Sequence, residues 1–418
     1  MSTEPKNRTP LSRDVVVLGW VSFFNDISSE MIYPLLPLFM VAVLGATATS
    51  LGWVEGIAQA VVAALTAWAG WRSDRFRRRV PYIRIGYGLP VAGKAILIGA
   101  VAWPMVLLGR TIDRVGKGIR SSPRDALIAD TTAAQDRGRA FGLHRAMDSA
   151  GAVVGVLLAA VLLWWLSGSP VKNPSVTQTE HTAAAFRTIF AVSAALSLAA
   201  VGFTFMLREP PHEAAGPVVA SPTATVTGLG GLSRGYWKVM VLLIVFSLAN
   251  SSDTFLLLRA GQIGLAPWEV VLLYAMFSLV YTLVSYPAGV ISDRFGRWRV
   301  IAVGWVLYAF VYLGLAEAGT ASIWPLLAVY GVYIGLTDGV GKALLADHVP
   351  RERRGFAIGL FYMATGVTTL VSSVLAGVLW DQVGPAAPFW FGGVTAAAAV
   401  VLLLVMRPWR ASRPVDPK

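Results

Sequence analysis

The residues of this chain best suited to chemistry are ionisable side chains set within an apolar stretch at 103–123. The central members of this group are Arg110, Asp113, Arg114 and Lys117. Together with Arg120 and Arg124 they fall within a helical arc of about 120°. Each central charge facing lipid would cost roughly 2.5–3.5 kcal/mol. The arc is therefore expected to face protein or water and to line a substrate pathway, although lipid headgroups would also explain Arg120 and Arg124.

Two carboxylates lie one helical turn apart in the first apolar stretch, 15–40. They are Asp26 and Glu30, with Tyr33 on the same face. In a low dielectric they repel, so one should hold a proton unless a cation neutralises it. Arg114 is predicted at the depth of Asp26, so protonation would break a carboxylate–guanidinium pair and shift the equilibrium between cavity states. A permanent ion-pair network that locks the two helices together explains the same residues.

The second half of the chain offers fewer such groups, namely Asn250, Asp253 and Asp338. Asp253 is a candidate contact for a proton or substrate, although a helix-end cap or a pair with Arg259 would also explain it. Asn250 is a candidate hydrogen-bonding group for substrate or for a neighbouring helix. In the first half, Lys94 lies deep within an apolar stretch, with Glu55 as its candidate partner.

Such groups need helices long enough to cross a membrane. The 418 residues are 56% hydrophobic and 14% charged, against roughly 25% charged residues in soluble domains. One span needs about 20 apolar residues. The predicted spans are 15–40, 50–71, 82–102, 103–123, 140–165, 183–206, 237–258, 268–290, 300–316, 323–344, 357–379 and 388–406. The sequence therefore predicts an all-α membrane protein with twelve transmembrane helices.

The chain also repeats itself. The run Gly70 to Arg75, which includes Asp74, recurs as Gly289 to Arg294, which includes Asp293; the run 126–130 (Ala-Leu-Ile-Ala-Asp) recurs as 343–347 (Ala-Leu-Leu-Ala-Asp). A Pro- and Gly-rich segment at 208–236 reads as a linker. We therefore expect two pseudo-symmetric six-helix bundles, 1–207 and 237–418, joined by a cytoplasmic linker, 208–236. Such repeats commonly place a site between two bundles that rock against each other.

The charge distribution predicts orientation. The net charge is +12, with arginines clustered in the loops after the second, eighth and tenth spans. This pattern argues against nucleic acid and places both termini in the cytoplasm, in a multi-pass protein of the bacterial inner membrane. There is no cysteine, and the four histidines lack ligand spacing. These absences exclude disulfides and thiolate chemistry, and we expect no metal or cofactor.

The second-half loop resembles a loop motif of the major facilitator superfamily, Gly-x-x-x-Asp-Arg-x-Gly-Arg. The matching positions are Gly289, Asp293, Arg294, Gly296 and Arg297. The first-half loop matches less closely, at Gly70, Asp74 and Arg75. The resemblance, to the drug-exporter-like members, implies alternating access. It also implies that these two loops hold the cytoplasmic side closed, through an Asp set against the positive end of a helix from the other half.

The sequence thus favours a secondary active transporter of a small organic solute, proton-coupled and with export as one direction. The expected partners are that solute, protons and the lipid bilayer, and the expected oligomeric state is a monomer. The alternatives are an importer or symporter of an organic anion, and a non-transporting sensor or scramblase. An enzyme is disfavoured because the sequence has no His-Asp pair, no metal-ligand cluster and no Cys nucleophile.

Overall fold

The computed structural model describes residues 11–76, 78–133, 136–167, 176–209, 232–349 and 354–406. Within these ranges the regular structure is helical, and none of it is β-strand. Most of the predicted linker lies outside them, so the division at 207 and 237 stays a prediction. Arg77, which stands where the loop motif has its second glycine, also lies outside the described residues.

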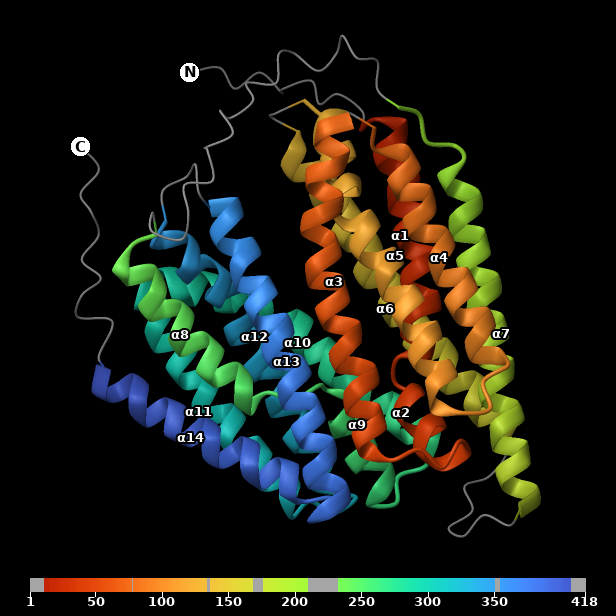
Figure 1. Ribbon diagram of the computed structural model, residues 1–418, viewed down its shortest axis with the longest axis vertical. Helices are drawn as coiled ribbons and strands as arrows, with labels where there is room; N and C mark the ends of the chain where they lie inside the picture. Colours follow the sequence, from red (N-terminus) through yellow and green to blue (C-terminus); the bar gives the residue numbers. More distant parts are fainter. Residues whose placement is uncertain are drawn as a thin grey trace, which may run out of the picture.

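The first half contributes six membrane-length segments (Figure 1). The first of them is broken into α1 (Arg13–Ile32), α2 (Leu36–Leu38) and a short π-helix (Phe39–Val43). The others are α3 (Ala48–Phe76), α4 (Val80–Ile98), α5 (Trp103–Asp130), α6 (Arg137–Ser167) and α7 (Val176–Thr204).

The second half repeats this plan. Its first segment is also broken, into α8 (Arg234–Ala249) and α9 (Thr254–Gln262). The others are α10 (Pro267–Phe295), α11 (Arg297–Ala316), α12 (Ile323–Asp347), α13 (Arg354–Gln382) and α14 (Ala387–Met406). The described ranges therefore hold twelve membrane-length segments in two six-helix bundles, which confirms the predicted fold.

Ten of these segments are long and apolar enough to cross a membrane by composition. The exceptions are α4, which carries Arg84 and Lys94, and α5, which carries the charged arc. On α5 the side chains of Arg110, Asp113, Arg114 and Arg120 are all buried. As expected from the insertion cost, the charged face of α5 is turned toward protein.

Glycines let α4 and α5 pack closely. Gly86 and Gly93 on α4 face Gly116 and Gly109 on α5, a spacing of seven residues on each helix. A methyl group on Gly116 would lie 2.6 Å from Gly86 O, and one on Gly109 would lie 2.7 Å from Gly93 O. This close approach fixes the rotation of α5 and hence the direction of its charged face.

Gly116→Ala is expected to lower the free energy of unfolding of the purified protein by about 1–3 kcal/mol, and with it the melting temperature, because the added methyl group must push α4 and α5 apart. Gly88→Ala on α4 is the matched control, since an added Cβ there meets nothing within 4 Å. Equal melting temperatures for the two variants would contradict this packing.

The two broken segments interrupt their helices near the candidate site. Pro34, which cannot donate a backbone hydrogen bond, lies in the break between α1 and α2. The break between α8 and α9 is satisfied by side chains of other helices. Tyr308 Oη donates to Ala249 O at 2.7 Å, and Ser372 Oγ donates to Asn250 O at 3.0 Å. Irregular backbone at membrane depth is tolerated when it is satisfied in this way.

The two halves meet through α3 with α13 and through α6 with α10. The glycines of the first interface run from Gly377, beside Ala48, to Gly366, beside Ala63. These contacts occupy the part of α3 nearest its start. Figure 1 shows α3 and α13 converging toward that end and diverging toward the other.

We call the converging end, where α3 begins and α13 finishes, the capped end. The opposite end, where α3 and α10 finish, is the basic end. The described arginines that give the basic end its name are Arg72, Arg75, Arg78, Arg79, Arg294, Arg297 and Arg299.

Candidate functional site

A polar hollow lies between α1 and α5. It collects six of the predicted residues, together with Ser29 and Arg120. The six are Asp26, Glu30, Tyr33, Asp113, Arg114 and Lys117. A second, smaller hollow adjoins it through Ser29 and Asp113, and Arg110 lies in its wall. The structure thus brings together the two sets of charged residues singled out from the sequence.

The ion pairs of α5 differ from the predicted pairing with α1. Arg110 pairs with Glu55 of α3. Its Nε lies 3.0 Å from Glu55 Oε1, and both side chains are buried. Asp113 Oδ2 lies 4.0 Å from Arg110 Nη1 and 4.0 Å from Arg114 Nε. Within the described ranges, no carboxylate of α1 lies within 4.0 Å of an α5 cation. The expected pair of Asp26 with Arg114 is therefore absent here. The carboxylate beside Arg114 is Asp113 of its own helix, and that of Arg110 is Glu55 of α3.

The expected pair of Lys94 and Glu55 is also wrong. Lys94 Nζ donates to Ser28 Oγ and to Ser197 Oγ, and its side chain is 2% exposed. Glu55 is engaged by Arg110 instead. Both residues are intramembrane ionisable groups, which are functional candidates by default, but their partners depend on how α3, α4 and α7 pack.

The two α1 acids that line the hollow, Asp26 and Glu30, have neutral partners. Asp26 Oδ1 accepts a hydrogen bond from Asn25 Nδ2 at 3.0 Å. Glu30 Oε2 accepts one from Tyr274 Oη of α10 at 2.7 Å. Because Tyr274 belongs to the second half, Glu30 links the two bundles directly.

Arg114 and Lys117 form the basic wall of the hollow. Arg114 is 9% exposed, and its Nε has no hydrogen-bond partner. Lys117 is exposed and, among the described residues, makes no ion pair within 4.0 Å. Arg120, which also lines the hollow, binds α4. It donates from Nη1 to Gly86 O at 3.1 Å and stacks on Tyr87.

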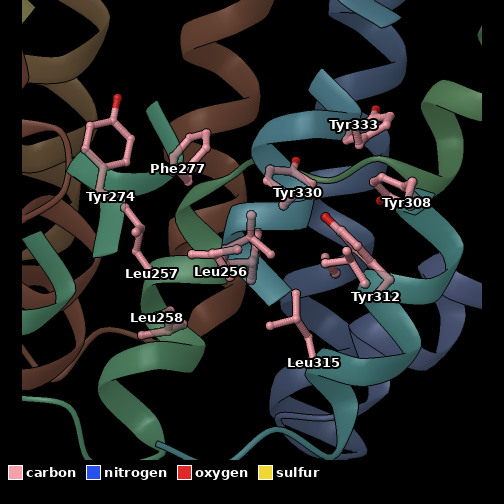
Figure 2. Close-up of a cluster of buried hydrophobic side chains, with 14 of the residues drawn as sticks. Leu256, Leu257, Leu258, Tyr274, Phe277, Tyr308, Tyr312, Leu315, Tyr330 and Tyr333 are labelled. Atoms are coloured by element: carbon pink, nitrogen blue, oxygen red, sulfur yellow. The ribbon is translucent and has the colours of Figure 1, made fainter. Parts of the chain in front are cut away.

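On the second half, Asp253 is bound by one member of a cluster of buried tyrosines. Tyr330 Oη donates to Asp253 Oδ1 at 2.6 Å. Figure 2 shows Tyr330 together with Tyr308, Tyr312 and Tyr333. The tyrosines come from α11 and α12 and are Tyr308, Tyr312, Tyr330 and Tyr333. Asp253 directly precedes α9 but makes no side-chain cap hydrogen bond there. Arg259 donates instead to Leu315 O, Ala316 O and Gln262, so neither alternative explanation of Asp253 applies to this structure.

The other predicted residues of the second half lie away from the two hollows. Asn250 Nδ2 donates to Tyr333 Oη at 3.4 Å. Asp338 is exposed on α12 and accepts a hydrogen bond from Tyr281 Oη at 3.4 Å. A substrate role for Asn250, Asp253 or Asp338 stays a prediction.

The repeated loops at the basic end make matching contacts within their own halves. Arg297 Nε lies 2.7 Å from Asp347 Oδ2, and Arg79 Nε lies 3.4 Å from Asp130 Oδ2. These contacts join each loop to the end of α12 or α5, which explains why the Ala-Leu-x-Ala-Asp run repeats along with the loop. Arg297 Nη2 also lies 3.4 Å from Asp293.

The remaining loop residues have different surroundings. Gly296 has a φ of 94°, a conformation that favours glycine. Gly70 packs against Ser122 of α5, whereas Gly289 has open space around it. Arg75 and Arg294 are exposed, and the side chain of Asp74 lies outside the described residues. A closing contact between halves at this end stays a prediction.

A contact of the predicted type does occur, but at the opposite end. Asp381, at the end of α13, accepts hydrogen bonds from the first residues of α3. Its Oδ1 lies 3.0 Å from Ala48 N, and its Oδ2 lies 2.8 Å from Thr49 N and 2.6 Å from Thr49 Oγ1. A carboxylate from one half thus binds the positive end of a helix in the other half.

Comparison with known proteins agrees with this architecture. The profile of the Major Facilitator Superfamily matches residues 18–276 and 254–418. An uncharacterized MFS-type transporter of Methanocaldococcus jannaschii is 30% identical over 406 residues, covering 96% of each chain. The chain therefore belongs to the Major Facilitator Superfamily and is an integral, multi-pass membrane protein.

More distant relatives differ in their named roles. The multidrug resistance protein MdtH of Cronobacter sakazakii is 26% identical over 381 residues, covering 88% of this chain and 84% of MdtH. Among solved structures, a mutant of the nucleoside transporter NupG superimposes with a TM-score of 0.77 at 13% identity, covering 94% of this chain and 99% of NupG. A D-xylose–proton symporter gives a TM-score of 0.69 at 17% identity, covering 97% and 98%. At these identities the structural matches show the fold alone.

Proposed function

We propose that this protein is a proton-coupled secondary transporter that exports a small organic solute by alternating access. The observation that carries the proposal is the pair of α1 carboxylates, Asp26 and Glu30. They face a polar hollow without a cation within 4.0 Å among the described residues, and one of them binds the opposite bundle. An intramembrane acid in such a setting is suited to take up and release a proton.

Glu30 offers a mechanism for coupling. An ionised carboxylate accepts a stronger hydrogen bond than a protonated one. Protonation of Glu30 therefore weakens its contact with Tyr274 and favours separation of α1 from α10. The charged groups facing the two acids come from α5 and α6: Arg114, Lys117, Arg120 and Asp148. Their summed field decides which of the two acids takes up a proton first.

Export is supported by the relation to MdtH, a multidrug resistance protein. The basic end, with its exposed arginines, faces the cytoplasm under this proposal. The hydrogen bonds of Asp381 with the start of α3 then lie at the outer side, where they would hold the two halves together. The protein acts as a monomer in the inner membrane. Import of an organic anion is the second candidate, favoured by the cations of α5.

Flux measurements on purified protein in proteoliposomes test the coupling. Solutes found by a ligand-induced thermal-shift screen are assayed with and without an imposed pH gradient. Asp26→Asn and Glu30→Gln are each expected to reduce or abolish the response to the gradient, since neither replacement can carry the proton.

The matched control is Glu317→Gln, which removes an exposed acid at the end of α11. It is expected to keep the wild-type response. Full gradient dependence in both the Asp26 and Glu30 variants would refute proton coupling through α1.

A further inference from the structure

The hollow between α1 and α5 has two walls of opposite charge. Asp26 and Glu30 project from α1, and Arg114 and Lys117 from α5. Among the described residues, no group of one wall lies within 4.0 Å of a group of the other. Opposite charges that face a shared space without pairing leave room for a molecule that contacts both.

The basic wall includes a buried guanidinium, that of Arg114, with an unused hydrogen-bond donor. The Arg114 side chain is about nine-tenths buried and lines the hollow, yet its Nε has no hydrogen-bond partner. A buried cation with an unsatisfied donor is costly. The guanidinium presents its donors in a planar fork that matches the oxygens of a carboxylate or phosphate. The nearby Lys117 adds a second, more exposed positive charge.

The acidic wall is suited to bind a cationic group. Asp26 and Glu30 each accept one hydrogen bond from a neutral side chain, Asn25 or Tyr274. An ionised carboxylate can accept several hydrogen bonds. An ammonium group, which carries only donors, would satisfy the remaining capacity of both acids.

The charge balance of the hollow decides between ligand classes. Its lining holds three carboxylates, including Asp113, and three cations, including Arg120. When all six groups are ionised, these charges cancel. A purely cationic or anionic ligand would add a net charge to a partly enclosed site, which is unfavourable. A zwitterion adds none and supplies a partner to each wall.

We propose that this hollow binds a small zwitterion, with its ammonium group at Asp26 and Glu30 and its carboxylate or phosphate at Arg114 and Lys117. The hollow is polar and partly enclosed, and its lining carries groups of both charges. The inference rests on the proposed transport function for its purpose. Binding itself can be measured without any gradient.

The test is a thermal-shift and calorimetric titration of the purified full chain at neutral pH. The probes are the protein amino acids and phosphoethanolamine. Each amino acid that binds is compared with its N-acetyl derivative, which lacks the cation, and its amide, which lacks the anion. We expect at least one zwitterion to bind, and at least about tenfold weaker binding after either modification, the loss of one charge-assisted contact.

Variants assign the two contacts. Arg114→Gln and Lys117→Gln are expected to remove the preference for the parent amino acid over its amide. Glu30→Gln is expected to reduce the preference over the N-acetyl derivative. Lys238→Gln, at an exposed position of α8, is the control and should preserve both preferences. Because Lys117 is exposed, its variant is expected to fold even if the Arg114 variant does not.

Two results would overturn the inference. One is the absence of binding by every zwitterion in the panel. The other is equal binding of a parent compound and its singly charged derivatives. Neither result bears on proton coupling, which the flux assay measures with any transported solute. Conversely, a zwitterion that binds and is transported at a rate independent of the pH gradient would leave the site assigned and the coupling refuted.

Discussion

Glu55→Ala is expected to lower the free energy of unfolding by about 3–5 kcal/mol, because it strands a buried guanidinium. Arg110, at 3% exposure, donates from Nε to Glu55 at 3.0 Å, and Glu55 is fully buried. Asp113, at 4.0 Å, is too distant to replace it with a hydrogen bond. The measurement is thermal unfolding of the purified variant, and loss of folded protein on expression is the extreme outcome.

Two further variants separate this pair from charge effects in general. The double variant Glu55→Gln with Arg110→Gln removes both charges and should recover most of the lost stability. Asp125→Ala breaks an exposed pair with Arg124 on the same helix as Arg110 and should cost less than about 1 kcal/mol. A Glu55→Ala protein as stable as the wild type would show that water reaches Arg110.

Asp381→Ala is expected to open the capped end. The replacement removes three hydrogen bonds that cross between the halves at the start of α3. Loss of a helix cap costs about 0.5–2 kcal/mol, and one to two kcal/mol corresponds to roughly a 5- to 30-fold shift between two states. The chain contains no cysteine, so paired spin labels at Val101→Cys and Val383→Cys report the separation of the halves at this end.

Glu269→Gln is the matched control for Asp381. Glu269 Oε2 accepts from Ala266 N at 2.7 Å at the start of α10, which is the same kind of contact confined to one half. Its replacement should leave the distance between the labels unchanged. Superimposable distance distributions for wild type and Asp381→Ala would rule out a closing role for Asp381.

Much of the fold could be predicted from hydropathy and the internal repeat. The segment predicted at 388–406 is α14, Ala387–Met406, and that at 268–290 lies within α10. The breaks in the first and seventh segments were not predicted, although Pro34 and the Asn-Ser-Ser-Asp run at 250–253 are local signals for them. Hydropathy averages over a whole window and does not register a short interruption.

The site was predicted in part. Charges on α5 cannot face lipid, so their inward orientation followed from energy alone. The pairs of Arg110 with Glu55 and of Lys94 with Ser28 did not, because each joins different helices whose mutual rotation depends on packing. Asp381 was not singled out at all. An acidic residue at a helix end is common, and only the assembled halves show that it caps α3.

The low hydropathy of α4 and α5 has a consequence for biosynthesis. A newly made α5 carrying its ionised arc cannot partition into the bilayer alone at roughly 2.5–3.5 kcal/mol per central charge. Glu55 on α3 and the glycine face of α4 are translated earlier and provide a neutralising partner and a close-fitting surface. Insertion of α5 therefore depends on assembly with α3 and α4, so these three helices must enter the membrane as a cooperative group.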